Sequence, residues 1–137
     1  LPWSSVDIGG IPLQEFCEQR GINCADNLRQ SIDVQVRRAA YHIIEGKGAT
    51  YYGIGSALAH IVSIILRNRR SILTVCTPVP DVVGIKNVTV ALPHLLSGEG
   101  IQATFIPSLD SEEENALKAS AKIIRDALDG LEAEGAL

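Results

Sequence analysis

The stretch that decides the fold is SIDVQVRRAAYHIIEGKGATYYGIGSALAHIVSIILRNRR, residues 31–70. Apolar residues recur in both of its halves at intervals of three and four, the spacing that places side chains on one face of an α-helix. The pattern therefore predicts two helices, each with an apolar stripe that faces a core. The first stripe is Ile32, Val36, Ala39, Ala40, Ile43 and Ile44, and the second is Leu58, Ile61, Val62, Ile65 and Leu66.

A glycine-rich segment, residues 46–55 with the sequence GKGATYYGIG, separates the two helices. Each of its four glycines costs a helix about 1 kcal/mol relative to alanine, so the segment indicates a break in the helix or the close approach of another backbone. Thr50 lies just past this break, where its hydroxyl can cap the second helix or face a ligand. On general grounds, a threonine in such a place is more often a cap or a turn residue.

The length and charge of the chain limit its class. A chain of 137 residues is expected to form one domain that buries a core without disulfides or metals. The net charge of −4 and the isoelectric point near 5.3 argue against a nucleic-acid-binding surface. The most apolar windows, residues 57–66 and 72–83, are too short or too interrupted to span a membrane.

Three cysteines, Cys17, Cys24 and Cys76, form no CxxC pair, so the sequence indicates neither a disulfide framework nor a zinc site. We expect reduced thiols in a cytoplasmic protein, since no signal peptide precedes the first residues. The chain contains no methionine and opens on Leu1-Pro2-Trp3, so we expect it to be a piece of a longer protein.

Short strands are predicted on both sides of the two helices. Residues 3–8 alternate weakly and are interpreted as a strand, followed by a brief helix through Cys17 or Glu18. After the long helices, Pro78 and Pro80 are expected to end a first strand, and Pro93 is expected to lie in a turn. Three β-rich runs predict an antiparallel meander, at residues 72–76, 88–92 and 102–106.

The last helix carries a clear start signal, with Asp110 or Ser111 as its cap and glutamates in its first turn. Its apolar stripe is Leu117, Ala121, Ile124, Leu128 and Leu131. The predicted class is therefore α+β, with a long broken helix packed on an antiparallel sheet and an amphipathic C-terminal helix.

The residues by themselves indicate no catalytic centre. His42, His60 and His94 are not at metal-ligand spacing from other ligands, and each is interpreted as structural. Ser4-Ser5 lacks the GxSxG pattern of hydrolases. Gly53-Ile54-Gly55 has no third glycine and follows a turn, so it is not a dinucleotide-binding fingerprint.

The chain nevertheless resembles the C-terminal half of the bacterial L-lactate dehydrogenases over nearly its whole length. The segments that carry the resemblance are WSS at 3–5, IGGIPL at 8–13, RAAY at 38–41, IIEGKGATYYGIG at 43–55, ILTV at 72–75 and VALP at 90–93. The resemblance implies that residues 1–137 are the substrate-binding domain of an NAD-dependent enzyme that interconverts pyruvate and L-lactate. It also implies that an upstream N-terminal Rossmann domain, absent from this chain, binds most of the NAD.

Three residues match positions with a role in this family. Thr50 matches the threonine that borders the substrate and discriminates pyruvate from the larger oxaloacetate, which favours the ligand-facing interpretation over the cap. Ala40 matches a small residue that lines the substrate pocket, and Ile54 matches the apolar residue against the nicotinamide ring. The family's catalytic histidine, in a GEHGDS motif, lies upstream, so no catalytic residue and no metal ligand are assigned to this chain.

The resemblance leaves some alternatives open. It implies a homotetramer, but the residues that bind the activator fructose 1,6-bisphosphate in some members lie upstream. The segment 77–84, TPVPDVVG, departs from the family pattern resembling DGxYG. A malate dehydrogenase of the lactate-dehydrogenase-like type is an alternative, against which Thr50 argues, and so is a non-catalytic oligomerisation or interaction domain of the same fold.

Overall fold

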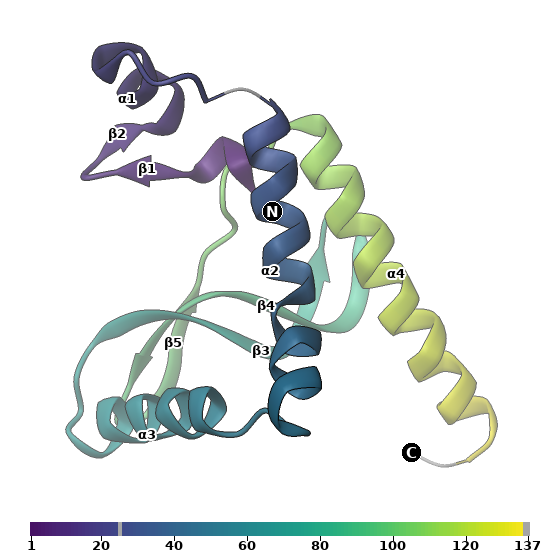
Figure 1. Ribbon diagram of the computed structural model, residues 1–137. Helices are drawn as coiled ribbons and strands as arrows, with labels where there is room; N and C mark the ends of the chain where they lie inside the picture. The colour runs from purple at the N-terminus through teal and green to yellow at the C-terminus, as the bar shows by residue number, and fades with distance from the viewer. Residues whose placement is uncertain (25, 136–137) are drawn as a thin grey trace. The chain divides into compact units, whose positions relative to one another are not determined.

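The computed structural model describes residues 1–24 and 26–135, and the chain divides into two compact units (Figure 1). The first unit comprises Leu1 and Trp3–Ser63, and the second comprises Pro2 and Ile64–Leu137. The elements in chain order are a 3-10 turn at Trp3–Ser5, β1 at Asp7–Ile8, β2 at Ile11–Pro12, α1 at Leu13–Arg20, α2 at Asp26–Lys47, α3 at Tyr52–Leu66, β3 at Ser71–Val82, β4 at Ile85–Ser97, β5 at Gly100–Thr104 and α4 at Ser111–Ala133.

The first unit begins with a small hairpin. β1 and β2 pair antiparallel, and the Asp7 carboxylate accepts a hydrogen bond of 2.8 Å from the Gly10 N–H across the turn. The strand predicted over residues 3–8 is therefore confirmed only for Asp7–Ile8, because Trp3–Ser5 forms a 3-10 turn. The brief helix predicted next is α1, which runs two residues beyond Glu18.

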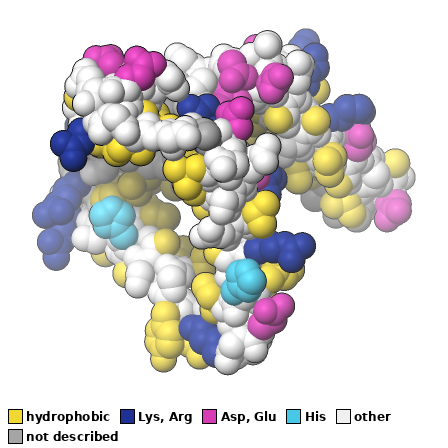
Figure 2. Space-filling model, turned by 45° about the horizontal axis from the view of Figure 1, so that its top comes forward, with side chains coloured by type: hydrophobic (Ala, Val, Ile, Leu, Met, Phe, Trp, Pro, Cys, Tyr) yellow, Lys and Arg dark blue, Asp and Glu magenta, His cyan; other side chains and the backbone are white. Residues whose placement is uncertain are grey.

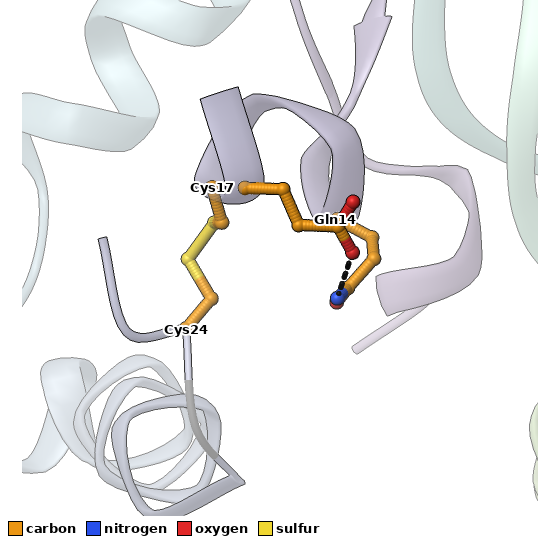
Figure 3. The surroundings of a disulfide bond; sticks show 4 residues. Gln14, Cys17 and Cys24 are labelled. Carbon is orange, nitrogen blue, oxygen red and sulfur yellow. Dashed lines mark hydrogen bonds between the residues drawn. A yellow bond between two sulfur atoms is a disulfide. The ribbon is translucent and has the colours of Figure 1, made fainter. Parts of the chain in front are cut away.

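A disulfide joins Cys17 to Cys24, whose Cα atoms lie 6.1 Å apart (Figure 3). The prediction of reduced thiols is therefore wrong for these two residues, whereas Cys76 is a free and exposed thiol. The chain turns back at the end of α1, where the Ile22 N–H donates to the Cys17 carbonyl at 2.9 Å. This reversal returns Cys24 to Cys17, and the spacing of seven residues gives no such signal in the sequence.

The predicted broken helix is confirmed as α2 and α3. The side chains of Asp26 and Ser31 both suit a helix cap, but Ser31 is not the cap because α2 already begins at Asp26. The Ser31 hydroxyl instead accepts a hydrogen bond from the Gln35 side chain at 3.1 Å, one turn further along α2. Residues 25–30 are mostly polar, which is typical of a loop or of the first turns of a helix, and Ala25 lies outside the described residues.

The second unit contains a three-stranded antiparallel sheet of order β3-β4-β5, as the predicted meander requires. β3 is longer than expected and continues through Pro78 and Pro80 to Val82, so the prediction that these prolines end it is wrong. β3 is an edge strand of this sheet, and an edge strand tolerates proline because one of its sides has no ladder to complete.

Pro93 lies within the central strand β4, opposite Thr74 of β3, and not in the expected turn. Its carbonyl accepts a hydrogen bond from the Phe105 N–H at 2.8 Å. Because proline has no N–H, Pro93 cannot return that bond to Phe105. The missing donor therefore faces β5, and the ladder between β4 and β5 ends at Thr104.

β3 and β4 are joined by a two-residue turn at Val83 and Gly84. The sequence of residues 84–87 is typical of a turn, but the observed turn begins one residue earlier and β4 already starts at Ile85. Val83 and Gly84 both have a positive φ, 46° and 81°, as the tight hairpin turns that match strand twist require. The Gly84 N–H donates to the Asp81 carboxylate at 3.2 Å. Val83 stands at a turn position where asparagine or glycine is usual, and the hydrogen bond from Gly84 to the Asp81 side chain helps to fix the backbone of the turn.

α4 packs on β4 and completes the core of the second unit. Its predicted start is confirmed, because Asp110 accepts hydrogen bonds from the N–H groups of Glu112 and Glu113, and the Glu113 side chain accepts one from the Asp110 N–H. Of the predicted stripe, Ala121 is fully buried and Leu117 packs at the edge of the core. The core residues are Val79, Val82, Val88, Val90, Leu92 and Ala121.

The disulfide gives a first testable prediction. Thiol titration of the oxidised chain should find the single thiol of Cys76, and full reduction should expose all three cysteines. Because the bridge closes the loop between α1 and α2, Cys24→Ser should lower the unfolding free energy of the first unit by about 2–3 kcal/mol. Thermal unfolding followed by circular dichroism, with and without dithiothreitol, measures the change.

Cys76→Ser is the matched control, because it removes an exposed thiol that takes part in no bridge. Its midpoint should equal that of the parent chain and should fall on reduction by the same amount. Three titratable thiols before reduction, or one midpoint shared by all variants in both conditions, would contradict the bridge.

Candidate functional site

Thr50, the main candidate site residue predicted from the sequence, lies in the connection between α2 and α3. Gly48 ends α2 with a left-handed backbone, φ +78°, and its N–H donates to the Ile44 carbonyl at 2.7 Å. The first hydrogen bond of α3 runs from the Gly55 N–H to the Tyr51 carbonyl at 2.8 Å. The residue whose carbonyl accepts the first bond of a helix is its N-cap, so Tyr51 occupies that position and Thr50 precedes it.

One cationic side chain reaches across this connection. Lys47 is the last residue of α2, and its Nζ lies 4.3 Å from the ring centroid of Tyr51 and 4.8 Å from that of Tyr52. The two rings lie next to each other, with centroids 4.6 Å apart and planes tilted by 59°. Both distances are within the range in which a cation is attracted to an aromatic face.

The other two predicted site residues lie on the helices that flank the connection. Ala40 is on α2 and is exposed, and Ile54 is in the first turn of α3 with 61% of its surface accessible. Beside Ile54, a Cβ added at Gly53 or Gly55 would meet nothing within 4 Å. The face of α3 around Ile54 is therefore open in the described part of the chain.

Comparison with known families decides what kind of domain carries this connection. A family model described as the alpha/beta C-terminal domain of lactate/malate dehydrogenase matches residues 2–134. The chain belongs to the lactate/malate dehydrogenase family. The L-lactate dehydrogenases of Geotalea daltonii and Thermus aquaticus are 56% and 45% identical to it over 131 residues. Each alignment covers 96% of this chain and 42% of the relative, so the chain spans about two fifths of their length.

Solved structures show the same fold. A lactate dehydrogenase from a Medee basin deep-sea metagenome library superposes with a TM-score of 0.86 at 32% identity, covering 93% of this chain and 41% of that one. These matches confirm both the expected α+β class and the resemblance to the C-terminal domain of L-lactate dehydrogenase.

Within this lactate/malate dehydrogenase domain, His94 is buried, whereas His42 and His60 are exposed. His42 and His60 lie in α2 and α3, as expected. His94 was expected in a turn, and this is wrong because it lies within β4 and is fully buried. Its Nδ1 lies 2.9 Å from the Thr104 hydroxyl on β5, and its Nε2 has no hydrogen-bond partner among the described residues.

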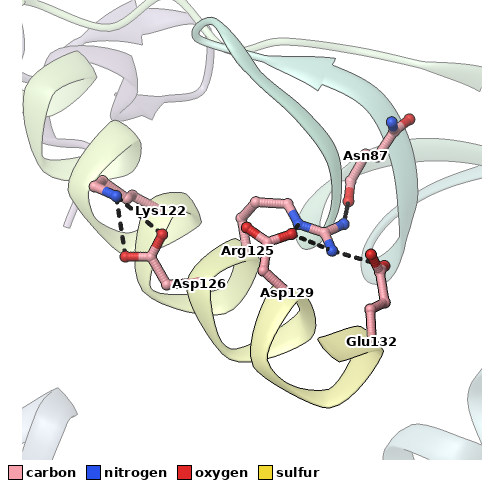
Figure 4. Close-up of polar contacts among 6 residues, drawn as sticks. All are labelled: Asn87, Lys122, Arg125, Asp126, Asp129 and Glu132. Atoms are coloured by element: carbon pink, nitrogen blue, oxygen red, sulfur yellow. Dashed lines mark hydrogen bonds and ion pairs between the residues drawn. The ribbon is translucent and has the colours of Figure 1, made fainter. Parts of the chain in front are cut away.

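A groove of about 820 Å³ on the second unit lies between the β3–β4 turn and α4 and is lined by the ion pairs of Lys122 and Arg125 (Figure 4). Arg125 donates to the Asn87 carbonyl at 2.6 Å, to Glu132 at 2.8 Å and to Asp129 at 2.8 Å. The hydrogen bonds to Glu132 and Asp129 raise the pKa of Arg125 above its ordinary value. Through the Asn87 carbonyl, Arg125 ties α4 to the start of β4, and its guanidinium is otherwise held by carboxylates of its own helix.

Much of the apolar stripe on α2 and α3 reaches the surface, although the sequence predicted that it faces a core. Val36 on α2 is 53% accessible and Leu58 on α3 is 58% accessible. Figure 2 shows hydrophobic side chains at the surface between charged ones. Further exposed members of the two helices are Val34, Ile43, Ile44, Ile54, Val62 and Leu66.

Other site chemistry is limited in the part of the chain that the structure describes. It holds no group of three histidine, cysteine or carboxylate side chains that could bind a metal. None of its helices is both long and apolar enough to cross a membrane. The contact of Lys47 with Tyr51 and Tyr52 was missed, although the sequence places a lysine four and five residues before two tyrosines.

Proposed function

We propose that this chain is the substrate-binding half of an L-lactate dehydrogenase, whose intact form interconverts pyruvate plus NADH and L-lactate plus NAD. The family supports an oxidoreductase of this kind, and the relatives named above carry that activity in their names. The observation that carries the proposal is the position of Thr50 in the connection between α2 and α3, one residue before the cap of α3.

Thr50 is proposed to border the substrate. Because Tyr51 takes the N-cap position, the Thr50 side chain is not needed to cap α3. A β-branched side chain at that point occupies volume with a methyl group and offers one hydroxyl. In the proposed pocket, this volume is where the second carboxylate of oxaloacetate would have to fit, so Thr50 favours pyruvate.

Ala40 and Ile54 are proposed to line the same pocket. Ala40 presents only a methyl group from α2, which leaves room for substrate. The exposed apolar side chain of Ile54, on an open face of α3, fits one face of a nicotinamide ring, which exchanges hydride with the substrate when bound. We assign no catalytic residue to this chain, so proton transfer and most of the NAD contacts belong to an N-terminal Rossmann domain of the same protein.

The exposed apolar faces of α2 and α3 are proposed to be covered in the intact protein, by the N-terminal domain and by further copies in a homotetramer. Val36 on α2 and Leu58 on α3 are among many exposed apolar side chains on these helices, and burying them against another domain or copy would be favourable. The proposed compartment is the cytoplasm, where a dehydrogenase meets pyruvate and NADH. A disulfide there is uncommon, and the thiol titration described above tests whether it forms.

Thr50→Gly in the intact protein tests the proposed function. Removing the side chain opens space for the second carboxylate and removes a wall from the pyruvate site, so pyruvate turnover should fall. A pocket difference of this size is worth about 1–3 kcal/mol, so the ratio of kcat/KM for pyruvate to that for oxaloacetate should fall about tenfold to a few hundredfold. Steady-state oxidation of NADH with each substrate measures the ratio.

Ala119→Gly, at an exposed position of α4, is the matched control, because it costs a helix about 1 kcal/mol and leaves the connection unaltered. It should leave the ratio of the two specificities unchanged. An unchanged ratio in Thr50→Gly would mean that Thr50 has no part in discrimination. A parent protein that prefers oxaloacetate would support a malate dehydrogenase, and one that turns over neither substrate would support an interaction domain without catalysis.

The association proposal has its own test on the chain described here. We expect sedimentation equilibrium to show dimers or larger species, held by the apolar faces of α2 and α3. Leu58→Lys places a charge on this face and should weaken association by about tenfold or more. Ala119→Lys, at an exposed position of α4, should leave it unchanged. A monomer at the highest soluble concentration would contradict the prediction.

A further inference from the structure

The backbone hydrogen bonds that flank the α2–α3 connection each belong to one helix. The bond from Gly48 to Ile44 closes α2, and the bond from Gly55 to Tyr51 opens α3. Between them stand Ala49 and Thr50, next to a glycine whose backbone rotates more readily than that of any other residue. Because each of these bonds holds only one helix, a contact that spans the connection is needed to fix the position of Thr50 between them.

Lys47 supplies such a contact. Its stem leaves the last residue of α2, and its ammonium group lies over the rings of Tyr51, the cap of α3, and Tyr52, the first residue of α3. The attraction of one cation to two adjoining rings holds the end of α2 against the start of α3. Thr50 lies inside the short loop that this contact closes.

We propose that Lys47 is a positioning residue for Thr50. Lys47 joins the end of α2 to the aromatic pair at the start of α3 and so fixes the substrate-facing threonine between them. The inference rests on the proposed function of Thr50 and adds a determinant of substrate discrimination outside the pocket wall. Lys47 acts through the rings of Tyr51 and Tyr52 and not through the substrate.

The sign of the effect separates this role from simple electrostatics. Oxaloacetate carries one more negative charge than pyruvate, so removing a nearby cation that attracts substrate would weaken oxaloacetate more and raise the ratio of pyruvate to oxaloacetate specificity. Loosening Thr50 admits the second carboxylate and lowers the same ratio. The two mechanisms therefore predict opposite changes.

The experiment uses Lys47→Met in the intact protein, which keeps the length and apolar stem of the side chain and removes its charge. The ratio of kcat/KM for pyruvate to that for oxaloacetate should fall about two- to fivefold, the range expected from losing an exposed cation–aromatic contact. Lys47→Arg should retain the parent ratio, since a guanidinium also stacks on aromatic faces. Lys118→Met, at an exposed lysine of α4, is the control for loss of one positive charge and should retain the ratio.

A double-mutant cycle completes the test. If Lys47 acts through Thr50, Lys47→Met should leave the ratio unchanged when it is made in the Thr50→Gly protein. An unchanged or raised ratio in Lys47→Met alone, or the same fall in both backgrounds, would overturn the inference while leaving the proposed function intact. Absence of pyruvate reduction by the parent protein would overturn the proposed function itself, and this inference with it.

Discussion

The left-handed backbone at Gly48 is the constraint on which the site depends. A residue with a side chain resists this conformation, so the helix that begins at Asp26 ends where a glycine permits it. The end of α2 in turn fixes where α3 starts, which gives the cap position to Tyr51 and releases Thr50 from it. An uninterrupted helix would place Thr50 within a regular turn and give it no special access to a ligand.

The two units have different packing characters. In the second unit, valines and leucines of β3 and β4 form a closed core with Ala121 of α4, and Arg125 joins α4 to β4 through a hydrogen bond to the Asn87 carbonyl. In the first unit, much of the apolar surface of α2 and α3 remains exposed, and a disulfide supplies the covalent restraint between α1 and the approach to α2. The exposed helix stripes of the first unit support the proposal that α2 and α3 are covered in the intact protein.

Sequence reasoning succeeded where a single local signal has one physical outcome. Four glycines within ten residues predicted the break, and an aspartate followed by glutamates in the first turn predicted the cap of α4. Sequence reasoning failed where the outcome depends on neighbours in space.

Pro78 and Pro93 were both expected to lie where a strand ends. The edge strand β3 accommodates Pro78, and the end of the β4–β5 ladder accommodates Pro93. The pairing of Cys17 with Cys24 depends on a chain reversal after α1, and the exposure of the helix stripes depends on what covers them. The contact of Lys47 with two tyrosines was likewise visible only once the turn brought them together.

The family resemblance predicts Thr50, Ala40 and Ile54 as site residues, and the structure places Thr50 in the four-residue connection between α2 and α3. The measurement that tests this account most directly is a crystal structure of the intact protein with NADH and an unreactive analogue of pyruvate. The account predicts that the Thr50 side chain contacts the analogue, with Ile54 against the nicotinamide ring and Lys47 still over Tyr51 and Tyr52. A Thr50 side chain turned away from the bound analogue, with the connection otherwise unchanged, would contradict it.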